Sequence, residues 1–289
     1  MIPANFNYHK ATSLKEAIAL SQELGEEAKY MSGGHSLLPM MKLRFATPEH
    51  IIDISKIEGL SYIKEDGDML KIGALTTQTE MEHNTLLKEN YPIFGDAVWL
   101  TADPSVRNCG TIGGNVAHGD AANDQPALML AMRATIIAEG IDGEKTIPID
   151  EFFHGFYMTA LEPSDVLTEI QIPKSTKNSG GAYYKVERKV GDYATAGVAV
   201  HVELDEAGVC QEIGIGLTNV SAVPMRLERG EEVLRGKKIT DDLIEQIGII
   251  AGEDCEPESD LRGSEAYKRS IVNTITKRML NKALERARK

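Results

Sequence analysis

Two short segments, Ser32-Gly-Gly-His-Ser36 and Thr111-Ile-Gly-Gly-Asn115, share one construction and give the strongest indication of how this chain folds. Each places two glycines among hydroxyl or amide side chains, and the first directly follows the strand-like run Ala28–Met31. Glycine readily adopts positive φ angles and lets another group approach the backbone without obstruction by a Cβ atom. Successive amides in such a turn can point the same way and bind an anion. The two segments together therefore predict a cradle for a diphosphate, although each alone could be only a tight turn.

A polar run, His118-Gly-Asp-Ala-Ala-Asn-Asp124, follows the second glycine segment and precedes an expected helix over Gln125–Met132. Asp124 could accept hydrogen bonds from ribose hydroxyls, a common task of a carboxylate beside a nucleotide. It could equally cap the helix, because Asn and Asp are both favourable N-cap residues. The spacing does not decide between these two interpretations.

The sequence on either side of these segments indicates an α+β fold. Ser13-Leu-Lys-Glu16 has the pattern of a capping box and starts a helix that we expect to end near Glu23. The run from 60 to 72, with Asp-Gly at its centre, predicts a hairpin. Further strands are expected at His50–Ile54, Ala134–Ala138, Lys145–Ile149 and Val166–Ile172, and further helices at Thr79–Asn90 and Pro92–Ala102.

The small, polar segment Ser175–Gly181 is the best candidate for a linker. We therefore expect an N-terminal domain over 1–177, with subdomains of about 1–55 and 56–177, and a C-terminal domain over 178–289. Strand character in the second domain predicts a three-stranded antiparallel sheet, formed by Ala182–Arg188, Ala196–Leu204 and Gln211–Thr218. Helices are expected over Asp241–Ala251 and from about Ser264.

The composition excludes several classes of function. With 289 residues, 42% of them hydrophobic and 26% charged, the chain has an ordinary globular composition. A net charge of −13 argues against a nucleic-acid partner, because a protein that binds phosphates along a strand needs a basic face. No run of 18 apolar residues occurs, so no membrane span is expected. Three cysteines without a C-x-x-C pair favour a reducing compartment and exclude an iron–sulfur cluster held by this chain alone.

The remaining candidate chemistry is sparse. No two histidines have the spacing of metal ligands, and neither a nucleophile elbow nor a Walker loop occurs. Arg107 and Lys185 could contact phosphate or ring oxygens. Tyr193 could stack on a planar ring, although core packing is the more common role of such a residue. Gly214 and Gly216 do not complete a dinucleotide fingerprint, and we expect them to mark a strand packed closely on its neighbour.

Four stretches in this order resemble the FAD-binding medium subunits of the molybdenum hydroxylase, or xanthine dehydrogenase-like, family. They are AKYMSGGHSLLPMMKLRF (28–45), DPSVRNCGTIGGNVAHGDAANDQPAL (103–128), ERKVGDYATAG (187–197) and CEPESDLRG (255–263). The pattern is most similar to that of aerobic carbon monoxide dehydrogenases, and it extends over essentially the whole chain. The resemblance implies a FAD-binding domain of the vanillyl-alcohol-oxidase (PCMH) type, followed by the family's flavoprotein C-terminal domain.

The resemblance also implies roles for particular residues. FAD would lie between the N-terminal subdomains, with its ring edge near the C-terminal domain. Asp124 matches the family's ribose-binding Asp, Lys185 a flavin-contacting Lys, and Tyr193 the residue that shields the isoalloxazine ring. Leu161 matches an apolar contact to adenine or flavin, whereas Cys109 stands where the family has Arg. The pyrophosphate contacts would come from Ser32, Gly33, Gly34, His35, Ser36 and Leu37 on one side and from Thr111, Gly113, Gly114 and Asn115 on the other.

Finally, the resemblance implies a division of labour among subunits, with no catalytic residue and no metal ligand in this chain. A large partner with a molybdenum–pterin cofactor would oxidise the substrate, and a small partner with [2Fe–2S] clusters would pass the electrons on singly. FAD would receive them and deliver them to a quinone or another acceptor. The expected assembly is a dimer of heterotrimers in the cytoplasm, with any contact to the inner face of the membrane made through partners.

Three alternatives remain open from the sequence. The chain could be the FAD subunit of a related aldehyde, nicotinate or purine hydroxylase. It could be a self-contained MurB-like flavin reductase, which would need its own substrate pocket and a proton donor near the flavin. It could also be a docking subunit that has lost FAD, although both glycine segments are intact.

Overall fold

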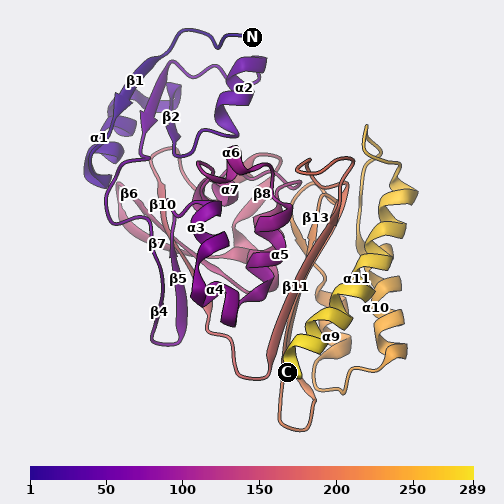
Figure 1. Ribbon diagram of the computed structural model, residues 1–289. Coiled ribbons are helices and arrows are strands. Elements are labelled where there is room, and N and C mark those ends of the chain that lie inside the picture. Colours follow the sequence, from indigo (N-terminus) through magenta and orange to yellow (C-terminus); the bar gives the residue numbers. More distant parts are fainter.

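A small parallel sheet opens the chain in the computed structural model, which describes residues 1–289 (Figure 1). Its strands are β1 (Asn7–Lys10), β3 (His50–Asp53) and β2 (Ala28–Met31), in that spatial order. Helix α1 (Leu14–Leu24) begins where Ser13 accepts a hydrogen bond from the Glu16 amide. The reciprocal half of the predicted capping box is absent, because the Glu16 carboxylate accepts from the amide and hydroxyl of Thr12 instead. A short helical turn, Gly25–Glu27, leads from α1 into β2.

The second sheet holds the centre of the N-terminal region and has five antiparallel strands. Their spatial order is β4 (Ile63–Asp66), β5 (Met69–Gly73), β10 (Val166–Pro173), β6 (Thr135–Gly140) and β7 (Gly143–Pro148). The helix predicted over 79–90 is two helices, because Asn84 stops the first and caps the second by accepting a hydrogen bond from Leu87 N–H. The helices of this region are α3 (Gln78–His83), α4 (Thr85–Asn90), α5 (Pro92–Leu100), α6 (Pro104–Arg107), α7 (Ile112–Ala117) and α8 (Asp124–Ala131). A turn at Ile149–Glu151 and the two short strands β8 (Phe153–Gly155) and β9 (Met158–Thr159) connect β7 to β10.

The C-terminal sheet has four antiparallel strands, so the prediction of three is wrong by one. The order is β11 (Ser179–Val186), β12 (Ala196–Leu204), β13 (Cys210–Thr218) and β14 (Met225–Arg226). Strand β14 pairs with Gly216 and Leu217 and has only two residues, too few for an alternating pattern. Three helices follow, α9 (Glu228–Leu234), α10 (Asp241–Asp254) and α11 (Glu265–Ala287). No helix of the structure combines the length and apolar character needed to cross a membrane.

The C-terminal sheet lies between helices from both halves of the chain (Figure 1). Tyr183 belongs to the N-terminal core, whereas its neighbour Ala182 belongs to the C-terminal core, because adjacent strand residues face opposite sides. Helix α8 packs against β13 at two glycines: a Cβ atom on Gly214 or Gly216 would lie 1.9 or 2.0 Å from a carbonyl oxygen of α8. The close packing predicted for these two glycines is confirmed. The shared core therefore holds the C-terminal sheet directly against the N-terminal domain.

One residue of this sheet gives the fold a predicted pH dependence. His201 on β12 lies 3.4 Å from the Ser175 hydroxyl, and burial, reinforced by the charge of Arg133, lowers its pKa to about 4. The unfolded chain therefore binds more protons than the folded chain between pH 4 and about 6.5, so this contribution to stability falls as the pH falls through that range. We expect a loss on the order of 2 kcal/mol between pH 7 and pH 4 that a His201→Gln variant does not show. Urea unfolding of both proteins at the two pH values measures it; equal losses would contradict the assignment.

Candidate functional site

The loop between β2 and α2 (Leu37–Leu43) carries the first glycine segment and has a row of unused amide donors. None of the six backbone N–H groups from Ser32 to Leu37 donates a hydrogen bond within the protein. Gly34 has a φ of 71°, in the left-handed region that favours glycine. The imidazole of His35 is exposed, and its Nδ1 lies 2.7 Å from the Gly33 carbonyl oxygen. This loop therefore has the free donors that an anion cradle requires.

The second glycine segment is not a turn, and that prediction is wrong. Thr111 caps α7 by accepting a hydrogen bond from the Gly114 amide, and residues 112–117 are helical. The amides of Ile112 and Gly113 donate to the carbonyl oxygens of Thr76 and Ala74 at 2.9 Å, and the Asn115 amide donates to Thr111. These N–H groups are thus occupied within the protein. The segment can therefore bind a ligand mainly through side chains, chiefly those of Thr111 and Asn115.

The two glycine segments contact each other closely. A Cβ atom on Gly33 would lie 2.0 Å from the carbonyl oxygen of Cys109, and one on Gly114 would lie 2.6 Å from the Ser32 hydroxyl oxygen. The Ser32 and Thr111 hydroxyl oxygens are 3.0 Å apart. Gly33 is therefore required by its contact with the backbone of Cys109, in addition to any ligand, whereas a Cβ atom on Gly114 would meet side-chain hydroxyl groups. Since Gly33 packs on the backbone of Cys109, this contact does not depend on which side chain stands at position 109.

An orphaned polar atom lies beside this contact. The side-chain oxygen of Asn115 is buried and has no hydrogen-bond partner in the protein, although the Asn115 carbonyl accepts from the Asn123 side chain at 2.9 Å. A buried polar atom without a partner is costly and is usually satisfied by a water or ligand. The free loop amides and this side chain fit a polar, phosphate-bearing ligand such as the one that the sequence predicts.

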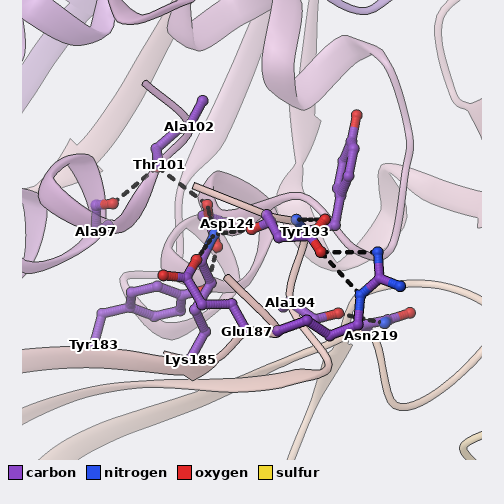
Figure 2. Close-up of polar contacts among 12 residues, drawn as sticks. Ala97, Thr101, Ala102, Asp124, Tyr183, Lys185, Glu187, Tyr193, Ala194 and Asn219 are labelled. Atoms are coloured by element: carbon purple, nitrogen blue, oxygen red, sulfur yellow. Dashed lines mark hydrogen bonds and ion pairs between the residues drawn. The ribbon is translucent and has the colours of Figure 1, made fainter. Parts of the chain in front are cut away.

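Asp124 and Lys185, which are 61 residues apart, form a buried ion pair (Figure 2). The Lys185 Nζ lies 2.9 Å from Asp124 Oδ2, and the two residues are 2% and 5% exposed. Asp124 also accepts from the Tyr183 hydroxyl at 2.6 Å and from the Thr101 hydroxyl at 3.1 Å. Burial, together with the Asp124 charge, raises the pKa of Tyr183 well above its ordinary value, so this hydroxyl remains a donor.

The interpretation of Asp124 as the cap of helix α8 is wrong. Asn123 occupies the N-cap position of α8, and Asp124 is the first helical residue. Its carboxylate is bound by three groups of the protein, one from Thr101 at the end of α5 and two from Tyr183 and Lys185 on β11. A contact from Asp124 to a ribose stays a prediction.

The loop between β11 and β12 carries Tyr193, whose ring is 40% exposed and thus outside the core. Burial raises the pKa of its phenol, with the charge of Asp120 acting in the same direction. Gly191 in the same loop packs against the backbone of Ala102, because a Cβ atom built on Gly191 would lie only 2.9 Å from the Ala102 carbonyl oxygen.

Two other predicted site residues, Leu161 and Arg107, make contacts within the protein. Leu161 follows β9 and is half-buried against the N-terminal core. Arg107 is buried, and its Nε lies 3.2 Å from Glu82 while one terminal nitrogen donates to the carbonyls of Thr101 and Ala102. It thus supports the turn on which the Tyr193 loop rests.

Sequence reasoning missed two residues that hold this loop. Asn219 has a φ of 57°. Its side-chain nitrogen donates to the Ala194 carbonyl oxygen at 2.6 Å, and its backbone N–H donates to the Ala121 carbonyl oxygen. Arg262 pairs with Asp192 at 3.4 Å. Arg262 lies within the CEPESDLRG stretch, to which no role was attached; Asn219 carries no local signal beyond its position after a strand.

Comparisons with known proteins agree along the whole chain. Residues 4–175 match the family described as the FAD binding domain in molybdopterin dehydrogenase, and residues 181–283 match the CO dehydrogenase flavoprotein C-terminal domain. The chain is 46% identical over 286 residues to the carbon monoxide dehydrogenase medium chain of Hydrogenophaga pseudoflava, covering 99% of both chains. It is 40% identical to that of Afipia carboxidovorans, covering 100% of both. A solved structure of carbon monoxide dehydrogenase from Hydrogenophaga pseudoflava superposes with a TM-score of 0.96 and covers 99% of each chain.

Proposed function

The chain belongs to the FAD-binding subunits of the molybdopterin dehydrogenase family, and from this premise we propose that it is the medium chain of a carbon monoxide dehydrogenase. Full-length identity of 46% and 40% to two medium chains of that enzyme supports the proposal. The structural observation that supports it most is the run of six free amides from Ser32 to Leu37 beside the unpartnered oxygen of Asn115.

The proposed pyrophosphate site uses the loop amides as its main donors. The residues concerned are Ser32, Gly33, Gly34, His35, Ser36 and Leu37, with Thr111, Gly113, Gly114 and Asn115 facing them. Amides aimed at one point bind phosphate oxygens without a side chain, and the hydroxyl contact between Ser32 and Thr111 keeps the two sides at a constant separation. Because the amides of α7 are occupied, we assign most of the anion binding to the first loop.

The proposed ring site lies at Tyr193, in the loop between β11 and β12. Its exposed ring provides a planar surface for the isoalloxazine. The ammonium group of Lys185 is held by Asp124 and by the Asp192 carbonyl, both at 2.9 Å, so its orientation is set before any ligand binds. Because Asp124 compensates its charge, we propose that Lys185 serves the flavin as a fixed hydrogen-bond donor. Asp124 and Leu161 are retained as proposed contacts to the ribose and to an apolar part of FAD.

FAD, when bound, accepts two electrons and exchanges them singly, and the chain supplies binding, orientation and exclusion of water. We propose that the electrons come from [2Fe–2S] clusters of a small partner subunit, after a large partner with a molybdenum–pterin cofactor has oxidised the substrate, and that they leave to a quinone. The proposed assembly is a dimer of heterotrimers in the cytoplasm. The resemblance of the whole chain to carbon monoxide dehydrogenases and the three free thiols, Cys109, Cys210 and Cys255, support this assignment.

Purification of the chain together with its co-expressed neighbours tests the proposal. We expect FAD, iron and molybdenum in the complex and reduction of a dye by carbon monoxide. Dye reduction by an aldehyde, nicotinate or a purine, without any by carbon monoxide, would replace the proposed substrate with one of a related hydroxylase. Turnover of NAD(P)H by the chain alone would favour a self-contained reductase. A complex that contains iron and molybdenum but no flavin would refute FAD binding.

A further inference from the structure

The CEPESDLRG stretch forms a turn at 260–263 that is built around a buried lysine. The Asp260 carboxylate accepts hydrogen bonds from the amides of Arg262 and Gly263, at 2.7 and 3.1 Å. Its other oxygen lies 2.8 Å from the Nζ of Lys268, a residue of α11 that is 2% exposed. Removing an ammonium group from water is costly unless the group is paired. The buried ammonium group of Lys268 is paired with Asp260, and this pair fixes the conformation of the turn.

Arg262, in this turn, contacts the loop that carries Tyr193. Tyr193 and Ala194 of that loop are labelled in Figure 2. The Arg262 guanidinium carbon lies over the Tyr193 ring, 5.7 Å from its centroid, within the range of cation–π attraction. One of its terminal nitrogens pairs with the carboxylate of Asp192. Its Nε is buried and has no hydrogen-bond partner in the protein. Arg262 thus contacts both the ring and the residue before it.

We propose that Arg262 is the positioning residue for the Tyr193 ring; this inference rests on the proposed binding of FAD. A guanidinium over one face of the ring leaves the other face for a planar ligand. The ion pair with Asp192 restrains the backbone next to Tyr193, so the ring is set before the flavin arrives. Arginine suits this task because its planar, weakly hydrated group both stacks on an aromatic ring and binds a carboxylate.

Arg188 is a matched control in the same loop. Its guanidinium also binds the Asp192 carboxylate, at 2.9 Å, but its side chain is 48% exposed and makes no cation–π contact with Tyr193. If Asp192 only needs a positive neighbour, loss of either arginine will have the same effect. If the contact with the ring matters, only the loss of Arg262 will change the environment of the flavin.

The experiment compares Arg262→Gln, Arg188→Gln, Tyr193→Ala and the Arg262→Gln/Tyr193→Ala double variant in the complex with its co-expressed partners. A stacked tyrosine quenches flavin fluorescence, so we expect emission per bound FAD to rise several-fold in Tyr193→Ala and clearly in Arg262→Gln. Arg188→Gln should match the wild type. The double variant should equal Tyr193→Ala, because Arg262 acts through that ring. Arg262→Lys, which keeps the charge and loses the planar group, should fall between the wild type and Arg262→Gln.

Two kinds of failure are distinguishable. Wild-type complex without flavin would refute the proposed function. Wild-type complex with flavin whose emission is unchanged by Arg262→Gln, or changed equally by Arg188→Gln, would refute only the positioning role. Should Arg262→Gln not yield a folded complex, Arg262→Lys decides the matter: emission equal to the wild type overturns the proposal, and an increase that disappears in the Tyr193→Ala background supports it.

Discussion

A Gly33→Ala variant is expected to lose bound FAD almost completely while the rest of the chain stays folded. The added methyl carbon would lie 2.0 Å from the carbonyl oxygen of Cys109, far inside van der Waals contact. This neighbour is backbone, so it cannot rotate away as a side chain would. The loop must therefore move outward, which takes its six free amides away from the pyrophosphate and separates Ser32 from Thr111. We expect FAD to bind about a hundredfold more weakly, equivalent to about 3 kcal/mol.

The FAD-to-chain ratio of the purified complex and its affinity for FAD after flavin removal measure this effect. Gly95→Ala is the matched control, because no atom lies within 4 Å of a Cβ atom built on that helical glycine. It should retain FAD and gain slightly in stability, since alanine favours a helix over glycine. Circular dichroism establishes that both variants are folded. Full occupancy in a folded Gly33→Ala complex would show that the first loop is not the pyrophosphate site.

The glycine segments also show how far local sequence leads. Strand β2 and the loop after it were predicted correctly, because a short apolar run ending in Ser-Gly-Gly leaves few conformations. The same reasoning was wrong for Thr111–Asn115, which begins a helix. Its amides are bound to Ala74 and Thr76, residues more than thirty positions away that no local pattern connects with it. The two similar motifs therefore have different roles. The first has free backbone amides, and the second packs against the first and supports it.

The buried pair of Asp124 and Lys185 was beyond sequence reasoning for a related reason. The resemblance implies a ligand contact for each residue and no contact between them. They meet only because α8 packs against the C-terminal sheet, where Gly214 and Gly216 allow the close approach. The glycines were predicted to mark close packing, but the partner of that packing could not be named. Pairs formed across a domain interface depend on the register of the whole sheet, as does the extra strand β14.

A Lys185→Met variant is expected to destabilise the chain by about 3–5 kcal/mol, because it leaves the Asp124 carboxylate buried without its cation. The hydroxyls of Tyr183 and Thr101 still donate to that carboxylate, but they carry no charge. Denaturant unfolding of the isolated chain measures the loss. Lys71→Met removes a lysine from the exposed pair with Asp66, at 2.7 Å, and should cost less than about 1 kcal/mol.

The double variant Lys185→Met/Asp124→Asn separates the pair from the packing around it. A neutral amide in place of the carboxylate removes the unpaired charge, so the double variant should be more stable than Lys185→Met alone although it carries one more substitution. Additive losses would show that the two residues stabilise the chain independently. Because α8 and β11 are joined by this pair, its coupling energy also measures how firmly the C-terminal domain, and with it the Tyr193 loop, is held against the proposed flavin site. A strong coupling would mean that the pair orients the two domains before FAD binds, whereas a negligible one would leave that task to the shared apolar core.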